Sequence, residues 1–150
     1  MSEHIFWPVT VLDPTQEGFL ESPVGIAAQE LTTEALIASG QEVQVASDRA
    51  NALLSPTAAL GEHCILGVLV TDSNNEQALG GIVIANKNPE STELLALGVT
   101  KNYRQQWIAS DLVNALRKTT SGELKAHIET SSNDHLLRIL EKLNIHISKN

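Results

Sequence analysis

The stretch TELLALGVTKNYRQQWIAS, residues 92–110, constrains the fold more than any other part of the chain. Thr92 to Val99 is an apolar segment of strand length, and a short basic turn with Lys101 and Arg104 follows it. The turn leads directly into residues 105–119, which have apolar side chains at helical spacing. A strand that passes through a turn into a helix presents the backbone N–H groups of the helix N-terminus. This order therefore predicts a site for an anion such as a pyrophosphate.

The length and composition predict one compact domain over residues 1–150. With 42% hydrophobic residues the chain can bury a core, and no apolar run approaches the roughly 20 residues that a membrane-spanning helix needs. The first residues, MSEHIFWPVT, carry Glu3 and no basic region ahead of an apolar stretch, which argues against a secretory signal. We therefore expect a cytoplasmic protein without a membrane segment.

The cysteine and histidine residues give no indication of a metal site. Cys64 is the only cysteine, which excludes a disulfide within the chain and a cysteine-based zinc site. The five histidines lack the spacing of a ligand set. We expect no metal, and we expect Cys64 to be a small core side chain rather than a nucleophile.

The formal net charge of −8 narrows the class of partner. With 18 acidic and 10 basic residues, the chain is poorly suited to neutralise nucleic-acid phosphates, so we expect no nucleic-acid binding. The same charge suits a cationic amine substrate or a basic protein partner. It is equally explained by solubility alone.

The order of predicted elements indicates an α/β fold with a mixed, mostly antiparallel sheet flanked by helices. Asp13 is expected to cap a short turn that Pro23 ends. Gly40 is expected to end the first long helix. The predicted strands are 5–12, 64–71, 78–85, 92–99, 124–129 and 145–148, and the predicted helices are 24–39, 47–55, 105–119 and 131–143.

Two motifs in this order resemble the GNAT superfamily of acyl-CoA N-acetyltransferases. The first is a strand ending Leu97-Gly98-Val99 followed by Arg104 to Ala109, which is similar to the family's Leu-x-Val and Arg-x-x-Gly-x-Gly/Ala. The second is residues 133–145, similar to Asn-x-x-Ala-x-x-Leu-Tyr-Glu-Lys-x-Gly-Phe. The resemblance covers about residues 62–147. It implies a GNAT-like fold and an acetyl-CoA-dependent N-acetyltransferase that acts on a primary amine by direct attack.

The resemblance also implies roles for individual residues. Val99 would offer a backbone N–H to the acyl carbonyl, where negative charge develops during acyl transfer. Glu93 would be the general base for the substrate ammonium, with His127 as a second candidate. The residues implied in binding acetyl-CoA are Leu97, Gly98, Val99, Arg104, Gln105, Gln106, Trp107, Ile108, Ala109 and Asn133.

Two of these residues have a purely structural alternative. Gly98 fits either a kink at a β-bulge or a close approach of the strand to a helix. Glu93 is either the base or a solvated glutamate at a strand end. Its even spacing from Val99 places both on one face of the strand unless a bulge lies between them.

Two departures from the family pattern favour a second function, a catalytically silent module that binds CoA or a protein partner. Trp107 stands where the family has its central glycine, and Leu140 stands where many members have a tyrosine that acts as general acid. After the last helix there is room for one strand instead of two. An uncovered sheet edge is an association surface, so we also expect a homodimer.

Overall fold

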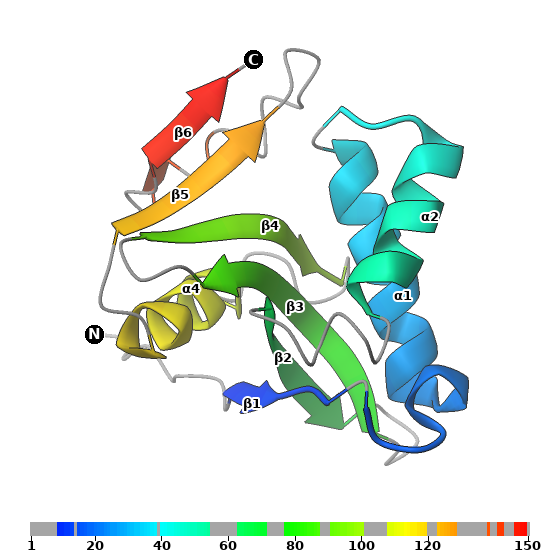
Figure 1. The fold of residues 1–150 in the computed structure, drawn as a ribbon. Helices are drawn as coiled ribbons and strands as arrows, with labels where there is room; N and C mark the ends of the chain where they lie inside the picture. Colours follow the sequence, from blue (N-terminus) through cyan, green and yellow to red (C-terminus); the bar gives the residue numbers. More distant parts are fainter. Residues whose placement is uncertain are drawn as a thin grey trace.

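A mixed sheet forms the centre of the computed structural model, which describes residues 9–13, 15–38, 40–54, 63–71, 77–87, 91–100, 108–119, 123–128, 138, 141–142 and 146–149. Within these ranges the sheet has six strands in the order β1-β2-β3-β4-β5-β6 (Figure 1). Strands β1 to β4 pair antiparallel, and β5 and β6 continue the sheet in parallel. The strands are β1 (Val9–Val11), β2 (His63–Thr71), β3 (Gln77–Lys87), β4 (Ser91–Val99), β5 (Glu123–Ile128) and β6 (His146–Lys149).

Helices cover both faces of the sheet. The 3₁₀ turn η1 (Phe19–Glu21) and the helices α1 (Pro23–Ala38) and α2 (Val43–Leu53) lie on one face, and α4 (Ile108–Thr119) lies on the other (Figure 1). Arg138, Glu141 and Lys142 are helical, within the predicted last helix. The predicted fold class is therefore confirmed, and within the described residues one strand, β6, follows that helix. None of the helices in the described ranges has the length and apolarity to span a bilayer.

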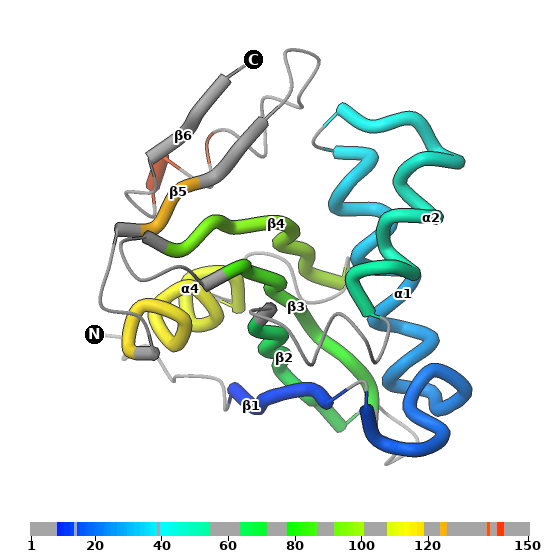
Figure 2. Tube along the Cα trace, in the orientation of Figure 1, coloured from blue at the N-terminus to red at the C-terminus, as the bar shows by residue number. Residues whose placement is uncertain are grey.

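The α1–α2 hairpin begins and ends where local capping dictates. Ser22 Oγ accepts a hydrogen bond from the Gly25 N–H, which caps the start of α1. Pro23 is therefore the first residue of α1, whereas we had expected it only to end the preceding turn. At the other end, Gly40 has φ 107°, and the Gln41 N–H donates to the Leu36 carbonyl, which closes a Schellman motif. The trace in Figure 2 shows the chain reversing here.

The start predicted for the second helix was four residues too late. Ser47 and Asp48 resemble a cap, but α2 already begins at Val43, with Glu42 as the N-cap residue in an extended conformation. The Gly40 reversal brings the chain directly against α1, and Ala46 of the first turns is fully buried there. Asp48 instead accepts a hydrogen bond from Gln44 Nε2 on the exposed side of α2.

Strand β3 contributes to two separate hydrophobic cores. Ile82 and Ile84 face α1 and α2, whereas Val83 and Ala85 face α4, and all four side chains are fully buried. Complete burial of one Val or Ile side chain is worth about 1.5–3 kcal/mol. A strand buried on both faces explains why residues 78–85 are almost continuously apolar.

Thr32 is a polar residue inside the α1 core. Its hydroxyl is completely buried and has no hydrogen-bond partner among the described residues. Its neighbour Thr33 differs, because the Thr33 hydroxyl donates to the Gln29 carbonyl at 2.8 Å. A buried hydroxyl without a partner destabilises a protein by about 1–3 kcal/mol.

We therefore predict that Thr32→Val raises the free energy of unfolding by about 1 kcal/mol, because it replaces an unsatisfied hydroxyl with a methyl group of similar size. Urea denaturation of the purified variant measures this change. Thr33→Val is the matched control and should lower stability by about 0.5–1.5 kcal/mol, since it removes a formed hydrogen bond. Equal effects of the two substitutions would contradict the prediction.

Candidate functional site

Strands β4 and β5 separate part of the way along the sheet. They pair in parallel from Ser91 with Glu123 to Leu94 with Ala126. Among the described residues, the pairing between the two strands ends at Leu94. Beyond Leu94, β4 continues beside β3 to Val99, while β5 continues beside β6 to Ile128. Figure 1 shows the two strands together at their starts and spread apart at their ends. We call this region, residues 95–99 of β4 and 127–128 of β5, the β4–β5 divergence.

Alternate backbone groups of β4 point into the divergence. The Thr100 N–H donates to the Gly80 carbonyl at 2.9 Å, so Thr100 belongs to a hydrogen-bonded pair with β3. In an antiparallel ladder the inward and outward groups alternate, so Gly98 also points toward β3. The N–H and C=O groups of Leu97 and Val99 consequently point away from β3, toward the side that β5 has left.

A β-bulge interrupts β4 at Leu95. Ile84 pairs with Ala96 and Ala85 pairs with Leu94, which leaves Leu95 as the extra residue. The packing agrees with this register, because Leu94 and Leu97 both lie in the α4 core although they are three residues apart. Leu95 and Ala96, which lie between them, both contact the α1 core.

The bulge overturns the expectation that Glu93 and Val99 share a face. Glu93 precedes Leu94 and therefore lies on the α1 side of the sheet, whereas Val99 packs in the α4 core. The extra residue at Leu95 changes the parity of the count between them. Glu93 is half-buried, and its register neighbours are Asn86 on β3 and Lys125 on β5.

Gly98 allows a helix to pack closely against β4, and the prediction of a kink at Gly98 is wrong. It pairs regularly with Ile82, and the positive φ angles among the described glycines belong to Gly18 and Gly40. A Cβ atom on Gly98 would lie 3.0 Å from Leu31 Cγ and 3.1 Å from the Leu31 carbonyl oxygen. The structural alternative is therefore confirmed: Gly98 lets α1 approach β4.

Helix α4 begins beside the end of β4. Ile108 is its first described residue and is 1% exposed, and Ala109 is half-buried. Asp111 lies buried in the first turn, where a carboxylate interacts favourably with the helix dipole. Sequence reasoning did not single out Asp111.

Most of the predicted CoA-binding turn lies outside the described residues. This applies to Arg104, Gln105, Gln106 and Trp107, and also to Asn133 and Leu140. His127 belongs to β5, but its side chain is likewise outside the description. Their predicted roles stay predictions. Within the described ranges no group of three or more His, Cys, Asp or Glu side chains is placed to hold a metal ion.

A cavity of about 610 Å³ lies elsewhere, between β1, η1 and the start of α1. Its walls include Leu12, Phe19, Val24 and Leu69, and no residue of β4, β5 or α4 lines it. Asp13 at its rim accepts hydrogen bonds from the Thr15 hydroxyl and N–H, which hold the pKa of its carboxyl below the usual range. The cavity is separate from the β4–β5 divergence.

Comparison with known proteins identifies the fold. No protein-family model matches the chain, and no curated protein matches it significantly. Among solved structures, AAC(6')-Iy in complex with the bisubstrate analogue CoA-S-monomethyl-acetylneamine has a TM-score of 0.59 and 12% identity, over 93% of this chain and 90% of that chain. An acetyltransferase from Trypanosoma brucei has a TM-score of 0.57 and 13% identity, over 95% and 94%.

A third solved structure, a putative acetyl transferase from Pyrococcus furiosus, has a TM-score of 0.54 and 18% identity, over 90% of this chain and 91% of that chain. The chain spans 54% of the length of an aminoglycoside 6'-N-acetyltransferase complexed with coenzyme A. The likenesses with TM-scores from 0.54 to 0.59 show that the chain has the GNAT fold.

The packing of Gly98 gives a direct prediction. Gly98→Ala should lower the free energy of unfolding by about 1–3 kcal/mol, because the added methyl group meets the Leu31 backbone as well as its side chain. Thermal and urea unfolding measure the loss. Adding Leu31→Ala should leave most of it in place, since the Leu31 carbonyl remains; full recovery in the double variant would show that only the side chain is in the way.

Proposed function

We propose that this chain is an acyl-CoA N-acyltransferase of the GNAT type, which transfers an acetyl group from acetyl-CoA to a primary amine. The observation that carries the proposal is the β4–β5 divergence, where the backbone groups of Leu97 point toward the side of β4 that β5 has left. An extended ligand with amide groups can hydrogen-bond to such an edge as an added strand does. The pantetheine arm of CoA is a ligand of this kind.

The direction of the arm follows from the position of α4. The pyrophosphate would bind at the N-terminal end of α4, beside the end of β4, where helix N–H groups favour an anion. The arm would then run back along β4 from Val99 toward Leu95, with the thioester at its far end. In this arrangement Val99 lies beside the arm, and the Leu97 N–H is the donor for the developing oxyanion.

The position of Glu93 agrees with a thioester near Leu95 to Leu97. At about 3.3 Å per residue, Glu93 lies roughly 20 Å along the strand from Val99 but only about 13 Å from Leu97 and 7 Å from Leu95. A base must reach the reacting amine directly or through one water. Glu93 would accept the ammonium proton, and the amine nitrogen would attack the carbonyl carbon. The C–S bond would then break to release the CoA thiolate, and the second proton lost by the nitrogen would pass to the thiolate or to water.

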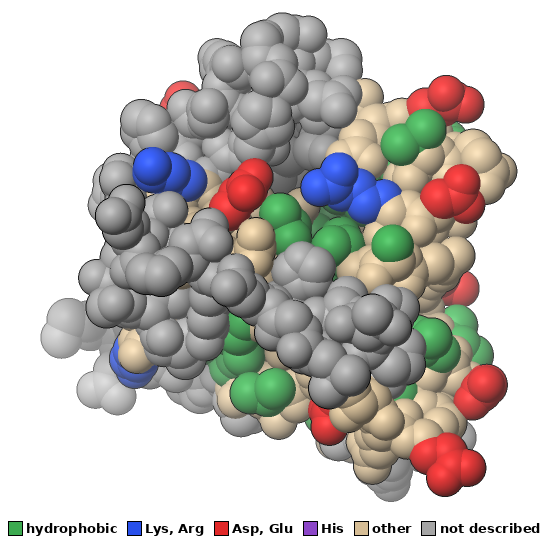
Figure 3. Space-filling view, viewed as in Figure 1, with side chains coloured by type: hydrophobic (Ala, Val, Ile, Leu, Met, Phe, Trp, Pro, Cys, Tyr) green, Lys and Arg blue, Asp and Glu red, His purple; other side chains and the backbone are tan. Residues whose placement is uncertain are grey.

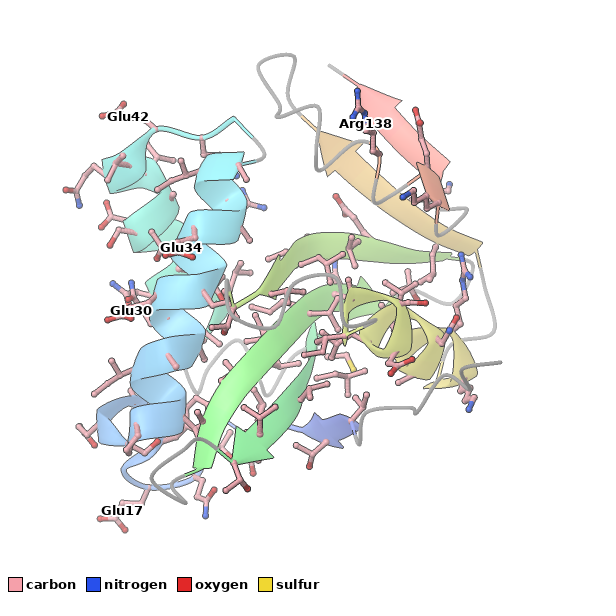
Figure 4. The ribbon with its side chains drawn as sticks, turned by 180° about the vertical axis from the view of Figure 1, so that it is seen from behind. Glu17, Glu30, Glu34, Glu42 and Arg138 are labelled. Carbon is pink, nitrogen blue, oxygen red and sulfur yellow. The ribbon has the colours of Figure 1, made fainter. Side chains whose placement is uncertain are left out.

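The surface charge supports a cationic acceptor. Glu30 and Glu34 are exposed on α1, and Glu42 is exposed at the hairpin (Figure 4). The space-filling view shows acidic side chains along the α1–α2 side of the molecule (Figure 3). A field of this sign raises the local concentration of amines and of basic protein segments. We propose a polyamine-like small molecule or a basic protein as the acceptor.

A silent CoA-binding or protein-binding module is the second candidate. Leu140 cannot protonate the leaving thiolate, and Tyr103 is the only tyrosine in the chain. Trp107 adds an indole where the family pattern has a glycine. Neither departure changes the backbone donors of β4.

Acetyl-CoA titration is the experiment that tests the proposal. We predict that the purified protein binds acetyl-CoA with a Kd of about 1 mM or tighter, because the β4 edge and the α4 N-terminus provide complementary groups. Isothermal calorimetry measures the Kd, and a rise in melting temperature supports it. Trp107→Gly is titrated in parallel.

The outcomes of this titration separate the two candidates. Binding by the wild-type chain fits both the transferase and a silent CoA-binding module, and CoA release on adding a polyamine establishes the transferase. Binding only by Trp107→Gly would show that the indole occupies the CoA groove, which favours the silent module. If neither protein binds, the transferase proposal is wrong and the protein-binding module remains.

The role of Glu93 gives a separate prediction. Glu93→Gln should lower the rate of amine acetylation about 10²-fold at neutral pH and leave acetyl-CoA affinity unchanged, because the amide keeps the shape but cannot accept a proton. The defect should shrink as the pH rises toward the pKa of the free amine, since a deprotonated amine needs no base. Initial rates from pH 7 to 10 measure this.

Glu141→Gln is the matched control for Glu93→Gln, because Glu141 is an exposed glutamate in the C-terminal helical segment. It removes the same charge far along the chain from β4. A defect of equal size in both variants, or one in Glu93→Gln that does not change with pH, would remove Glu93 from the mechanism.

A further inference from the structure

Two adjacent glycines of β3, Gly80 and Gly81, lie beneath both ends of the turn that connects β4 to α4. They form a β-bulge: Val68 pairs with Gly81 and Leu69 pairs with Leu79, so Gly80 is the extra residue. The bulge turns both glycines toward α4, because Leu79 and Ile82 on either side belong to the opposite core. The pair therefore leaves a shallow notch in the α4 face of the sheet, which we call the glycine notch.

Two hydrogen bonds hold the end of β4 at this notch. The Thr100 N–H donates to the Gly80 carbonyl at 2.9 Å, and the Thr100 hydroxyl donates to the Leu79 carbonyl at 2.7 Å. Val99, the preceding residue, pairs with Gly81. The last described residue before the turn is thus held at two points on β3.

The start of α4 packs against the same notch. A Cβ atom on Gly81 would lie 2.5 Å from Ile108 Cγ2 and 3.2 Å from Leu112 Cδ1. A Cβ atom on Gly80 would lie 3.2 Å from Ile108 Cδ1. Ile108 is buried, so its side chain fills the space that the two missing methyl groups leave.

We propose that Gly80 and Gly81 are positioning residues for the acyl-CoA site: the notch sets the height of the α4 N-terminus above the end of β4. The inference rests on the proposed function. The β4 backbone at Leu97 would hold the pantetheine arm and the α4 N-terminus would hold the pyrophosphate. One short length of β3 therefore determines the spacing between the two parts of the ligand site.

The size of the expected effect follows from the contact distance. Carbon atoms pack best at about 3.5–4.0 Å, so a methyl group on Gly81, placed 2.5 Å from Ile108 Cγ2, requires α4 to move away by about 1 Å. A misplacement of about 1 Å in a binding geometry can cost about 10²-fold in rate. We expect a loss of this order in CoA affinity or in kcat/KM.

The test compares Gly81→Ala with Gly67→Ala. Gly67 is the matched control, because its added methyl group would lie 2.9 Å from Leu12 Cδ1 and 3.1 Å from Leu79 Cδ1, on the opposite face of the same sheet. Calorimetry gives the CoA Kd, and amide hydrogen exchange of residues 108–112 reports the docking of α4 without any ligand. We expect a Kd about 10²-fold weaker and faster exchange for Gly81→Ala, with both readouts near wild type for Gly67→Ala.

A second-site substitution makes the test specific to the notch. Ile108→Ala removes Cγ2 and should restore CoA affinity and exchange protection to Gly81→Ala. Ile108→Val keeps Cγ2 and should restore neither. If Gly81→Ala does not fold, Thr100→Val serves instead: it removes the hydrogen bond to the Leu79 carbonyl, and we expect a several-fold loss of affinity.

The outcomes distinguish this inference from the proposed function. Equal losses for Gly81→Ala and Gly67→Ala, or rescue by Ile108→Val as complete as by Ile108→Ala, would overturn the positioning role. A wild-type protein that binds no CoA would refute the proposed function. In that case hydrogen exchange alone still decides whether the notch docks α4.

Discussion

The arrangement of the whole domain depends on one constraint, the burial of β3 on both of its faces. Its side chains alternate between the core beneath α4 and the core beneath α1 and α2. Strand β3 contributes two completely buried side chains to each core. The two helix layers are therefore positioned relative to each other through this strand, and anything that changes its register shifts one layer against the other.

The two bulges beside β3 show how this constraint shapes the candidate site. The bulge at Gly80 turns two consecutive residues toward α4, and the bulge at Leu95 turns two consecutive residues toward α1. Together they keep apolar residues on the correct faces while β4 bends away from β5. The divergence thus arises from side-chain packing on both faces, and the pattern of backbone groups along β4 is a consequence of it.

Much of the fold could be predicted from sequence because local patterns determine it. Strands β2 to β5 lie within two residues of their predicted ends, since apolar runs and turn residues mark them. The bulge at Leu95 could not be predicted, because Leu94 and Leu95 are both apolar and the pattern is the same in either register. The role of Gly98 depends on Leu31, which is distant in sequence, and the same is true of Gly81 and Ile108. For the candidate site, the sequence identified the correct strand and helix but not the faces on which Glu93 and Val99 lie.

The short pairing between β4 and β5 also affects how the domain opens. Among the described residues, β5 and β6 are joined to the rest of the sheet only by the pairing of β5 with Ser91 to Leu94 of β4. Strand β3, in contrast, pairs with β2 along almost its whole length and with β4 from Gly81 to Lys87. Partial unfolding follows the weakest boundary in a structure. The β5–β6 unit can therefore detach while β1 to β4 stay folded. A molecule that binds to both β4 and β5 at the divergence would hold the two strands together. Its presence would therefore change the order in which the parts of the domain unfold.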